Sequence, residues 1–285
     1  MNRLEKVLCI AQMHTPQEFC FPREHRAHGP AVSDVMRTFS EDGREMARFV
    51  LIHGAFHGAW CWRKTVTKLE KCGHQAQAID LPGQGDDATP LSKVTLESMA
   101  DRIVTALERS SDRAVLVGHS FGGMAISAAA EKASERLKAL IYVCAFLPRE
   151  GESQRAIAGR NPEATLQKSL IVSDDGISAT VMPDRVHDLF YHDCSPADAS
   201  DAISRLRPQV LAPLSTPVHL TAERFGGVPR AYVECTEDHA LAVELQRDMI
   251  GKSPPVAIRM LPSGHSPFLS MPDRLAQALI ELAPT

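Results

Sequence analysis

From residue 46 onwards, apolar runs of strand length alternate with stretches whose apolar positions recur at helical spacing. The runs with the composition of buried strands are 46–52, 76–81, 114–117, 137–145, 230–236 and 256–261. The stretches with helical spacing are 62–69, 95–107, 123–130, 241–250 and 274–282. Thr95 stands where it could cap the helix that follows it. Strands that alternate with helices pair in parallel through right-handed crossovers, so we predict an α/β fold with a doubly wound, mostly parallel sheet.

Two segments depart from this alternation. Residues 1–45 mix charges, prolines and histidines with little periodicity beyond an apolar patch at 7–11. We expect them to be a flexible N-terminal extension, or the product of a translation start upstream of a true start at Met46. Residues 149–228 are polar and carry only short helical patterns, which predicts an inserted, mostly helical lid above the strand ends. The core of the fold then comprises residues 46–148 and 229–285.

The sequence Gly118-His119-Ser120-Phe121-Gly122 has the form G-x-S-x-G between a predicted strand and a predicted helix. A sharp strand-to-helix turn exposes the serine hydroxyl, and the flanking glycines relieve the crowding that such a turn creates. The helix N-terminus offers free N–H groups and a positive dipole to a developing oxyanion. We therefore predict that Ser120 is a nucleophile.

A serine nucleophile requires a base, and the base requires an orienting acid; in this type of fold they follow in the order serine, acid, histidine. His265 lies in a loop just past the last predicted strand, so we take it as the base. Asp238 follows the strand 230–235, at the sheet edge where site residues gather, and is our choice of acid. Glu237 is its competitor, whereas Glu234 would be buried within the strand.

The oxyanion requires two donors. The backbone N–H of Phe121, which follows the nucleophile, is the first, and the second is expected from the loop 53–58, at Ala55. His53 and His57 in that loop could suggest a metal site. The loop has no acidic partner nearby, so hydrogen bonds that stabilise the turn are the expected role of both imidazoles.

Such a constellation performs acyl transfer through an acyl-enzyme and requires no cofactor or metal. The aromatic residues Phe56 and Phe146 are expected near the site, where they would favour a small hydrophobic acyl or alcohol group, although aromatic residues also serve as ordinary core. A small-molecule ester is therefore the expected partner.

The composition of the chain narrows the classes of partner and cellular location that remain. The charges nearly balance, with Lys+Arg 31 against Asp+Glu 35, which argues against a nucleic acid or an anionic membrane as partner. No apolar stretch reaches the roughly 18 to 20 residues of a transmembrane helix, and no secretory signal is evident. The 7 cysteines lack CxxC spacing and several lie in apolar strand-like runs, so we expect buried free thiols in a reducing cytoplasm. We leave open whether the protein forms a homodimer.

Taken together, these motifs resemble the α/β-hydrolase superfamily. Within it they resemble the branch of plant methyl-ester esterases, hydroxynitrile lyases and bacterial pyrethroid-type carboxylesterases. The resemblance covers roughly residues 47–283 and implies Ser120, Asp238 and His265 as the triad, with Ala55 and Phe121 as oxyanion donors. The segments that carry it are His53–Trp60, Val117–Met124, Ala145–Pro148, Glu223–Gly226, Cys235–Asp238 and Gly264-His265.

Two departures bear on the reaction. Hydroxynitrile lyases that resemble this chain carry a lysine just after the catalytic histidine and a threonine just after the first-strand histidine. Here these positions are Ser266 and Gly54, so no cation is evident for a departing cyanide and an esterase fits better. A lactonase, a thioesterase or a slow-turnover ligand receptor would use the same residues and stays open.

Overall fold

The computed structural model describes residues 46–161 and 165–284, so the predicted N-terminal extension 1–45 lies outside the described residues. Its central sheet has six strands in the order β2-β1-β3-β4-β8-β9. Every neighbouring pair in this sheet is parallel, which confirms the predicted α/β architecture. The strands are β1 (Arg48–Ile52), β2 (Gln75–Ile79), β3 (Ala114–His119), β4 (Leu137–Val143), β8 (Arg230–Cys235) and β9 (Ala257–Leu261).

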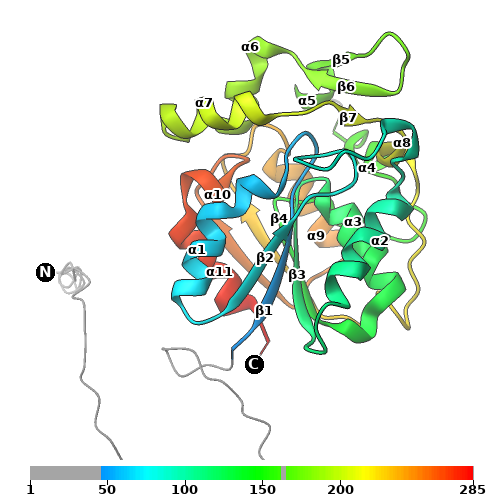
Figure 1. The fold of residues 1–285 in the computed structure, drawn as a ribbon, viewed down its shortest axis with the longest axis vertical. Helices are drawn as coiled ribbons and strands as arrows, with labels where there is room; N and C mark the ends of the chain where they lie inside the picture. Colours follow the sequence, from blue (N-terminus) through cyan, green and yellow to red (C-terminus); the bar gives the residue numbers. More distant parts are fainter. Residues whose placement is uncertain (1–45, 162–164, 285) are drawn as a thin grey trace, which may run out of the picture. The chain divides into compact units, whose positions relative to one another are not determined.

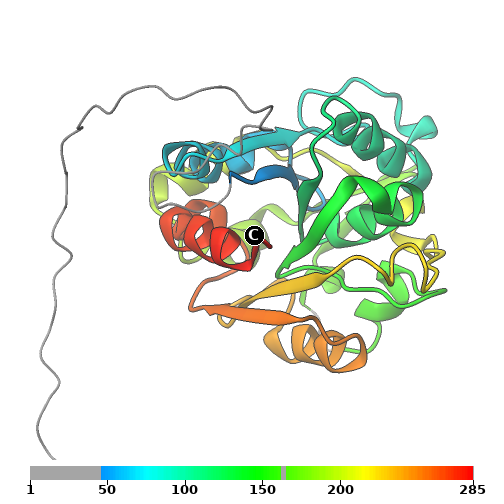
Figure 2. The same cartoon turned by 90° about the horizontal axis from the view of Figure 1, so that it is seen from below.

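Helices cover both faces of the sheet (Figures 1 and 2). They do so because apolar side chains point to both faces. In β1, Val50 and Ile52 belong to one buried cluster, and Phe49 and Leu51 belong to another. The first cluster includes side chains of α2 (Leu96–Leu107), α3 (Gly122–Ala133) and α9 (Val243–Lys252). The second includes side chains of α1 (Arg63–Lys71) and α11 (Pro272–Leu282). Shorter helical turns lie at η1 (Ala59–Trp62), η2 (Leu91–Lys93), η3 (Ser134–Arg136) and α10 (Pro267–Ser270).

The start of α2 follows from its sequence. The Thr95 hydroxyl accepts a hydrogen bond from the Ser98 amide at 3.0 Å, and the Ser98 hydroxyl accepts one from the Thr95 amide at 2.9 Å. This reciprocal cap satisfies two amides that a helix start otherwise leaves without partners, which is worth about 1 kcal/mol. The predicted cap at Thr95 is confirmed.

Residues 149–228 form an insertion between β4 and β8 that lies across the carboxyl ends of the sheet strands (Figure 1). It contains short helices, as predicted, and also a three-stranded antiparallel sheet, β5-β6-β7, which the sequence did not predict. Strands of two to four residues are too short to show an alternating pattern. The elements are α4 (Gln154–Ala158), α5 (Thr165–Lys168), β5 (Leu170–Val172), β6 (Ser178–Val181), α6 (Pro183–Val186), η4 (His187–Tyr191), α7 (Pro196–Arg205), β7 (Gln209–Val210) and α8 (Ala212–Ser215).

Candidate active site

Ser120 lies in the turn between β3 and α3 with φ at 52°, a left-handed conformation that few residues other than glycine adopt. The glycines around it are sterically required. A Cβ at Gly118 would lie 2.8 Å from the Gly122 carbonyl oxygen, and a Cβ at Gly122 would lie 2.6 Å from the His53 carbonyl oxygen. The turn therefore packs tightly on the β1 loop, and G-x-S-x-G here has the strand-turn-helix context that the sequence predicted.

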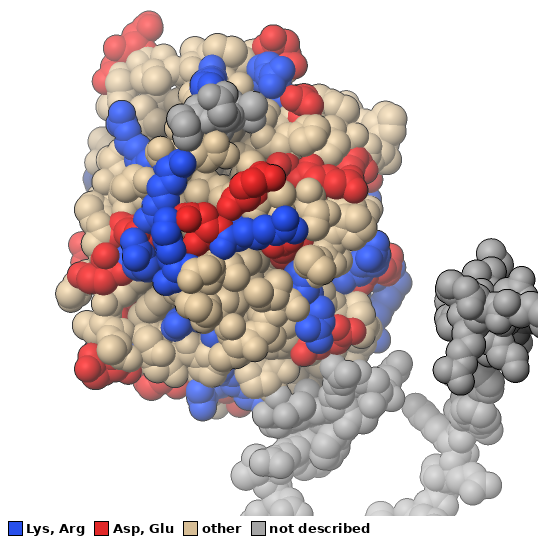
Figure 3. Space-filling view, turned by 180° about the vertical axis from the view of Figure 1, so that it is seen from behind, with Lys and Arg blue, Asp and Glu red and all other residues tan. Residues whose placement is uncertain are grey.

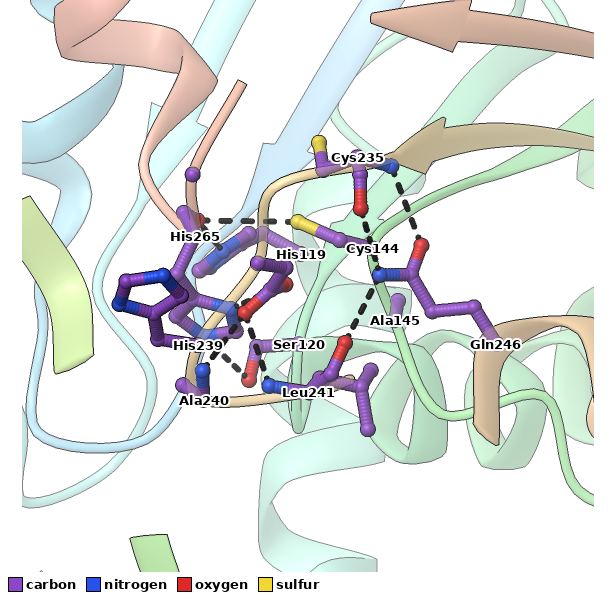
Figure 4. Close-up of polar contacts among 12 residues, drawn as sticks. His119, Ser120, Cys144, Ala145, Cys235, His239, Ala240, Leu241, Gln246 and His265 are labelled. Carbon is purple, nitrogen blue, oxygen red and sulfur yellow. Dashed lines mark hydrogen bonds and ion pairs between the residues drawn. The ribbon is translucent and has the colours of Figure 1, made fainter. Parts of the chain in front are cut away.

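The structure brings Ser120, His265 and Asp238 together in one buried chain of hydrogen bonds, of which Figure 4 labels Ser120 and His265. His265 Nε2 lies 3.1 Å from Ser120 Oγ, and His265 Nδ1 lies 2.7 Å from Asp238 Oδ2. Because a carboxylate only accepts, Nδ1 carries the proton and Nε2 is left to accept from the serine hydroxyl. This is the geometry that general-base activation of a serine requires.

The competing acids lie elsewhere. Glu237 is exposed, and its amide donates to the Ser263 carbonyl. Glu234 is buried in β8, as expected, and its carboxylate pairs with Arg247 at 2.7 Å. Asp238 is therefore the acidic residue of this group whose carboxylate reaches the imidazole of His265.

The loop that carries Asp238 is fixed from two sides. Asp238 Oδ1 accepts the amides of Ala240 and Leu241, each at 2.8 Å. Gln246, fully buried on α9, accepts the Cys235 amide at 3.1 Å and donates to the carbonyls of Cys235 and Leu241 at 3.0 and 2.8 Å (Figure 4). Both ends of the loop thus bond to one side chain, which limits where the carboxylate can move.

The backbone of His265 is held by side chains from neighbouring strands. Its carbonyl accepts from His119 Nε2 at 2.7 Å and from the Cys144 thiol at 3.6 Å (Figure 4). Burial, together with the neighbouring imidazoles of His265 and His57, lowers the pKa of His119, so it stays neutral. Burial raises the pKa of the Cys144 thiol, which keeps it protonated as a donor. Both groups therefore act as neutral donors that fix the peptide of His265.

The insertion also holds the loop that carries His265. Asp193 Oδ2 accepts the Gly264 amide at 2.7 Å and lies 3.2 Å from the Ser263 hydroxyl, which donates to it. Gly264 is the residue that permits this approach, because a Cβ there would lie 2.6 Å from the His192 ring and 2.7 Å from Asp193 Oδ1. Residues of the insertion therefore help to position the imidazole.

Ala55 and Phe121, the residues of the predicted oxyanion donors, line the same cavity as Ser120. Within residues 46–161 and 165–284, neither the Ala55 amide nor the Phe121 amide donates a hydrogen bond, so both remain available to a ligand. His53 and His57 each make at least one hydrogen bond to backbone, as expected. His53 Nδ1 donates to the Gly54 carbonyl at 2.7 Å, and its Nε2 accepts the Leu81 amide at 3.1 Å.

His57 joins this loop to the insertion. Its Nδ1 donates to the Ala55 carbonyl at 2.8 Å, and its Nε2 accepts the hydroxyl of Tyr191 at 2.8 Å. Burial lowers the pKa of His57 to about 3, so the neutral imidazole persists across the physiological range. The preceding residue, Phe56, has φ at 66°, and its carbonyl accepts the Arg207 amide at 2.9 Å. A strained backbone is thus held by hydrogen bonds from the insertion.

Gly54 leaves no room for a side chain. A Cβ there would lie 2.8 Å from the Cβ of Ser120 and 2.9 Å from His119 Nδ1. The threonine that the resembling lyases carry at this position would therefore require the nucleophile to shift. Ser266, at the position of their lysine, is a buried neutral residue.

Ser120 opens into a cavity of about 320 Å³, at the lower end of the ~300–1,000 Å³ range of small-molecule sites. Ala55 and Phe121 line it, and so do Phe56 and Phe146, the two aromatic residues predicted near the site. A larger groove of about 810 Å³ runs past Asp238 and His239 but includes neither Ser120 nor either oxyanion donor. We therefore take the smaller cavity as the candidate substrate site.

The described residues contain a group with metal-ligand atoms close together. His119, Cys144 and His265 each place such an atom within 4.8 Å of the others. Both imidazoles and the thiol are already engaged in the hydrogen bonds around His265, and we therefore interpret the cluster as part of this hydrogen-bond network.

The face of the molecule in Figure 3 shows basic and acidic side chains interspersed, in line with the nearly balanced composition.

Several site residues could not be found from the sequence. Tyr191 and Asp193 lie within the insertion, and Gln246 is one polar residue on a helix of mixed composition. No local motif marks them. His119, by contrast, stands inside G-x-S-x-G, although the motif leaves its residue type free.

The chain is similar in sequence to several known proteins. Salicylic acid-binding protein 2 of Nicotiana tabacum is 32% identical over 257 residues, which cover 84% of this chain and 98% of that protein. Methylesterase 2 of Arabidopsis thaliana is 31% identical over 260 residues, with 86% and 98% covered. Two longer chloroplastic relatives from Arabidopsis thaliana, provisionally named methylesterases 15 and 13, are 32% identical, and the chain spans 58% and 57% of their lengths.

Solved structures show the same likeness. The structure of polyneuridine aldehyde esterase superposes with a TM-score of 0.77 at 26% identity, covering 84% of this chain and 100% of that one. A pyrethroid hydrolase from Sphingobium faniae JZ-2 superposes with a TM-score of 0.76 at 29% identity, covering 84% and 97%. The model of the alpha/beta hydrolase family matches residues 49–278. With the family-typical sheet and nucleophile turn already evident in its structure, this chain belongs to the α/β hydrolase family.

Proposed function

We propose that this protein is a carboxylesterase in which Ser120 is the nucleophile, His265 the general base and Asp238 the orienting acid. The observation that carries the proposal is the buried relay, with 3.1 Å from His265 Nε2 to Ser120 Oγ and 2.7 Å from His265 Nδ1 to Asp238 Oδ2. The names of its relatives, which include methylesterases and esterases, support the same reaction class.

The proposed reaction has two steps. His265 Nε2 takes the proton of Ser120 Oγ as the oxygen attacks the ester carbonyl, and Asp238 stabilises the resulting imidazolium. The amides of Ala55 and Phe121, two residues that line the cavity with Ser120, have no acceptor among the described residues and receive the oxyanion. His265 then protonates the leaving alcohol, and water hydrolyses the acyl-enzyme by the reverse sequence of proton transfers.

The cavity supports a small and largely apolar ester as substrate. Phe56, Phe121 and Phe146 line it next to Ser120, together with leucines of the insertion. The insertion would act as the predicted lid, because it supplies Leu166, Leu170, Leu211 and Leu214 to the lining of the cavity. A thioester or a lactone would meet the same nucleophile and donors.

A panel of methyl, aryl and pyrethroid-like esters and lactones, assayed with wild type and Ser120→Ala, tests the proposal. Wild type should hydrolyse at least one substrate, and the variant should lose at least about 10³-fold in kcat because the nucleophile is gone. The variant should keep the fold, which circular dichroism checks. Equal turnover by both proteins would remove Ser120 from the mechanism.

The alternatives are separable in the same assay. A hydroxynitrile lyase would release cyanide from mandelonitrile at a rate comparable with ester cleavage, and we expect no such release, because the neutral Ser266 stands where those enzymes have a lysine. A ligand receptor on this fold would bind ligands with its triad intact and turn esters over only slowly.

A further inference from the structure

The cavity that holds Ser120 has two chemically different ends. At its inner end the lining side chains are buried, among them Ser120, Phe121 and Phe146. At the other end, here called the cavity mouth, the lining side chains are exposed, namely Arg155, Gln167, Val172 and Ser215. A ligand that fills the cavity therefore meets the nucleophile and aromatic side chains among the buried residues, and the polar side chains of Arg155, Gln167 and Ser215 beside Val172 among the exposed ones.

Arg155 carries the single charge among the described residues that line this cavity. It lies in the first turn of α4, whose start is fixed by the Ser153 hydroxyl accepting the Ala156 amide at 3.2 Å. Two other arginines near α4, Arg149 and Arg160, both pair with Glu152. The Arg155 guanidinium has no hydrogen bond or ion pair with residues 46–161 or 165–284, so its donors remain free for a ligand.

We propose that the substrate is an ester that also bears an anionic group, and that Arg155 binds this group at the cavity mouth while Ser120 attacks the ester carbonyl. The proposal rests on the proposed function of Ser120. A guanidinium offers paired donors that match a carboxylate, and charged hydrogen bonds are stronger beside apolar walls than in open water. The cavity holds only about 320 Å³, so one small ligand contacts both ends.

Two pairs of esters isolate the charge. p-Nitrophenyl hexanoate and mono-p-nitrophenyl adipate differ in a terminal methyl against a carboxylate on the acyl side. 4-Ethylphenyl acetate and 4-(carboxymethyl)phenyl acetate place the same difference on the alcohol side. In Arg155→Gln we expect KM to rise about three- to tenfold for the anionic member of a pair, with kcat and the neutral member nearly unchanged. Arg155→Lys should retain part of the preference, and added salt should weaken it in wild type.

Arg109→Gln is the matched control. Arg109 is exposed and lies outside the cavity lining, and its substitution removes the same charge as Arg155→Gln. A charge-selective loss in either pair that Arg109→Gln does not reproduce supports the proposal. Equal changes for anionic and neutral esters in both pairs, or the same selective loss in the control, overturn it. Failure of the proposed function would look different, because Ser120→Ala would then keep its turnover of every ester whatever Arg155→Gln does.

Discussion

At the scale of single residues, the imidazole of His57 and the hydroxyl of Tyr191 meet at 2.8 Å although 134 positions separate them in the chain. The hydrogen bond matters because the other nitrogen of His57 holds the carbonyl of Ala55, the residue whose amide is a proposed oxyanion donor. Removing the hydroxyl would leave a buried acceptor without a partner and would loosen the peptide that has to meet the transition state.

We therefore expect Tyr191→Phe to lower kcat for a p-nitrophenyl ester about three- to tenfold and to cost about 1–2 kcal/mol of unfolding free energy. Steady-state kinetics and urea denaturation measure the two effects. Tyr142→Phe is the control, because Tyr142 is equally buried and its hydroxyl lies 2.8 Å from Ser127 Oγ. It should lose comparable stability and keep its kcat. A normal kcat in Tyr191→Phe would contradict the positioning role.

At the scale of elements, α9 does more than cover the sheet. Its buried Gln246 makes three hydrogen bonds to the backbone of the loop that joins β8 to the acid, at Cys235 and Leu241. An apolar residue of similar size would fill the space but leave one amide and two carbonyls without that partner. The loop would then hold Asp238 less tightly against His265.

Gln246→Leu should therefore lower kcat by roughly tenfold, with a smaller effect on KM, and should destabilise the fold by about 1–3 kcal/mol. Gln277→Leu on α11 serves as the comparison, because this glutamine is exposed and bonds only to Glu281 within the described residues. It should change neither quantity much. If Gln246→Leu loses stability and keeps full kcat, Gln246 is a structural residue and does not position the acid.

At the scale of the whole molecule, burial of several neutral histidines couples stability to pH. Burial lowers the pKa of His53, His57 and His119 below the ordinary value, for His57 to about 3. Above about pH 6.5 these groups are neutral in both the folded and the unfolded state, so they do not change the free energy of unfolding with pH. As the pH falls below that value, the unfolded chain takes up protons that the folded protein cannot, so the unfolded state is favoured.

The free energy of unfolding should thus fall as the pH drops below 6.5, by up to about 1.4 kcal/mol per pH unit for His57, and the lowered pKa values of His53 and His119 act in the same direction. Urea melts at pH 7.5, 6.0 and 5.0 measure this slope. His219→Gln removes an exposed imidazole whose pKa is raised by Glu150, and it should leave the slope nearly unchanged. A flat stability between pH 6.5 and 5 would show that the buried histidines do not titrate as expected.

Membrane insertion and location also belong to this scale. Within residues 46–161 and 165–284, no helix combines the length and the apolar character of a membrane span. Of the described cysteines, Cys61, Cys144 and Cys235 are buried free thiols, as expected, whereas Cys72 is exposed. The cytoplasmic location stays a prediction, and some relatives are chloroplastic.

The sequence by itself determined the sheet and the residues of the proposed mechanism, because these depend on local information. Strand and helix periodicity fixes the order of elements, and a nucleophile turn needs glycines at fixed spacing around Ser120. Asp238 and His265 could be named because each directly follows a strand whose carboxyl end lies at the same edge of the sheet.

Only the tertiary structure decided which side chains hold this machinery in place. Tyr191, Asp193 and Gln246 act through hydrogen bonds to backbone or side chains outside their own helix or loop, and one polar residue leaves no periodic signal. The cavity likewise depends on the tertiary structure. In the sequence, Arg155 is one of many charged residues. Folding gives it a distinct role, because it places Arg155 at the cavity mouth without a partner among the described residues.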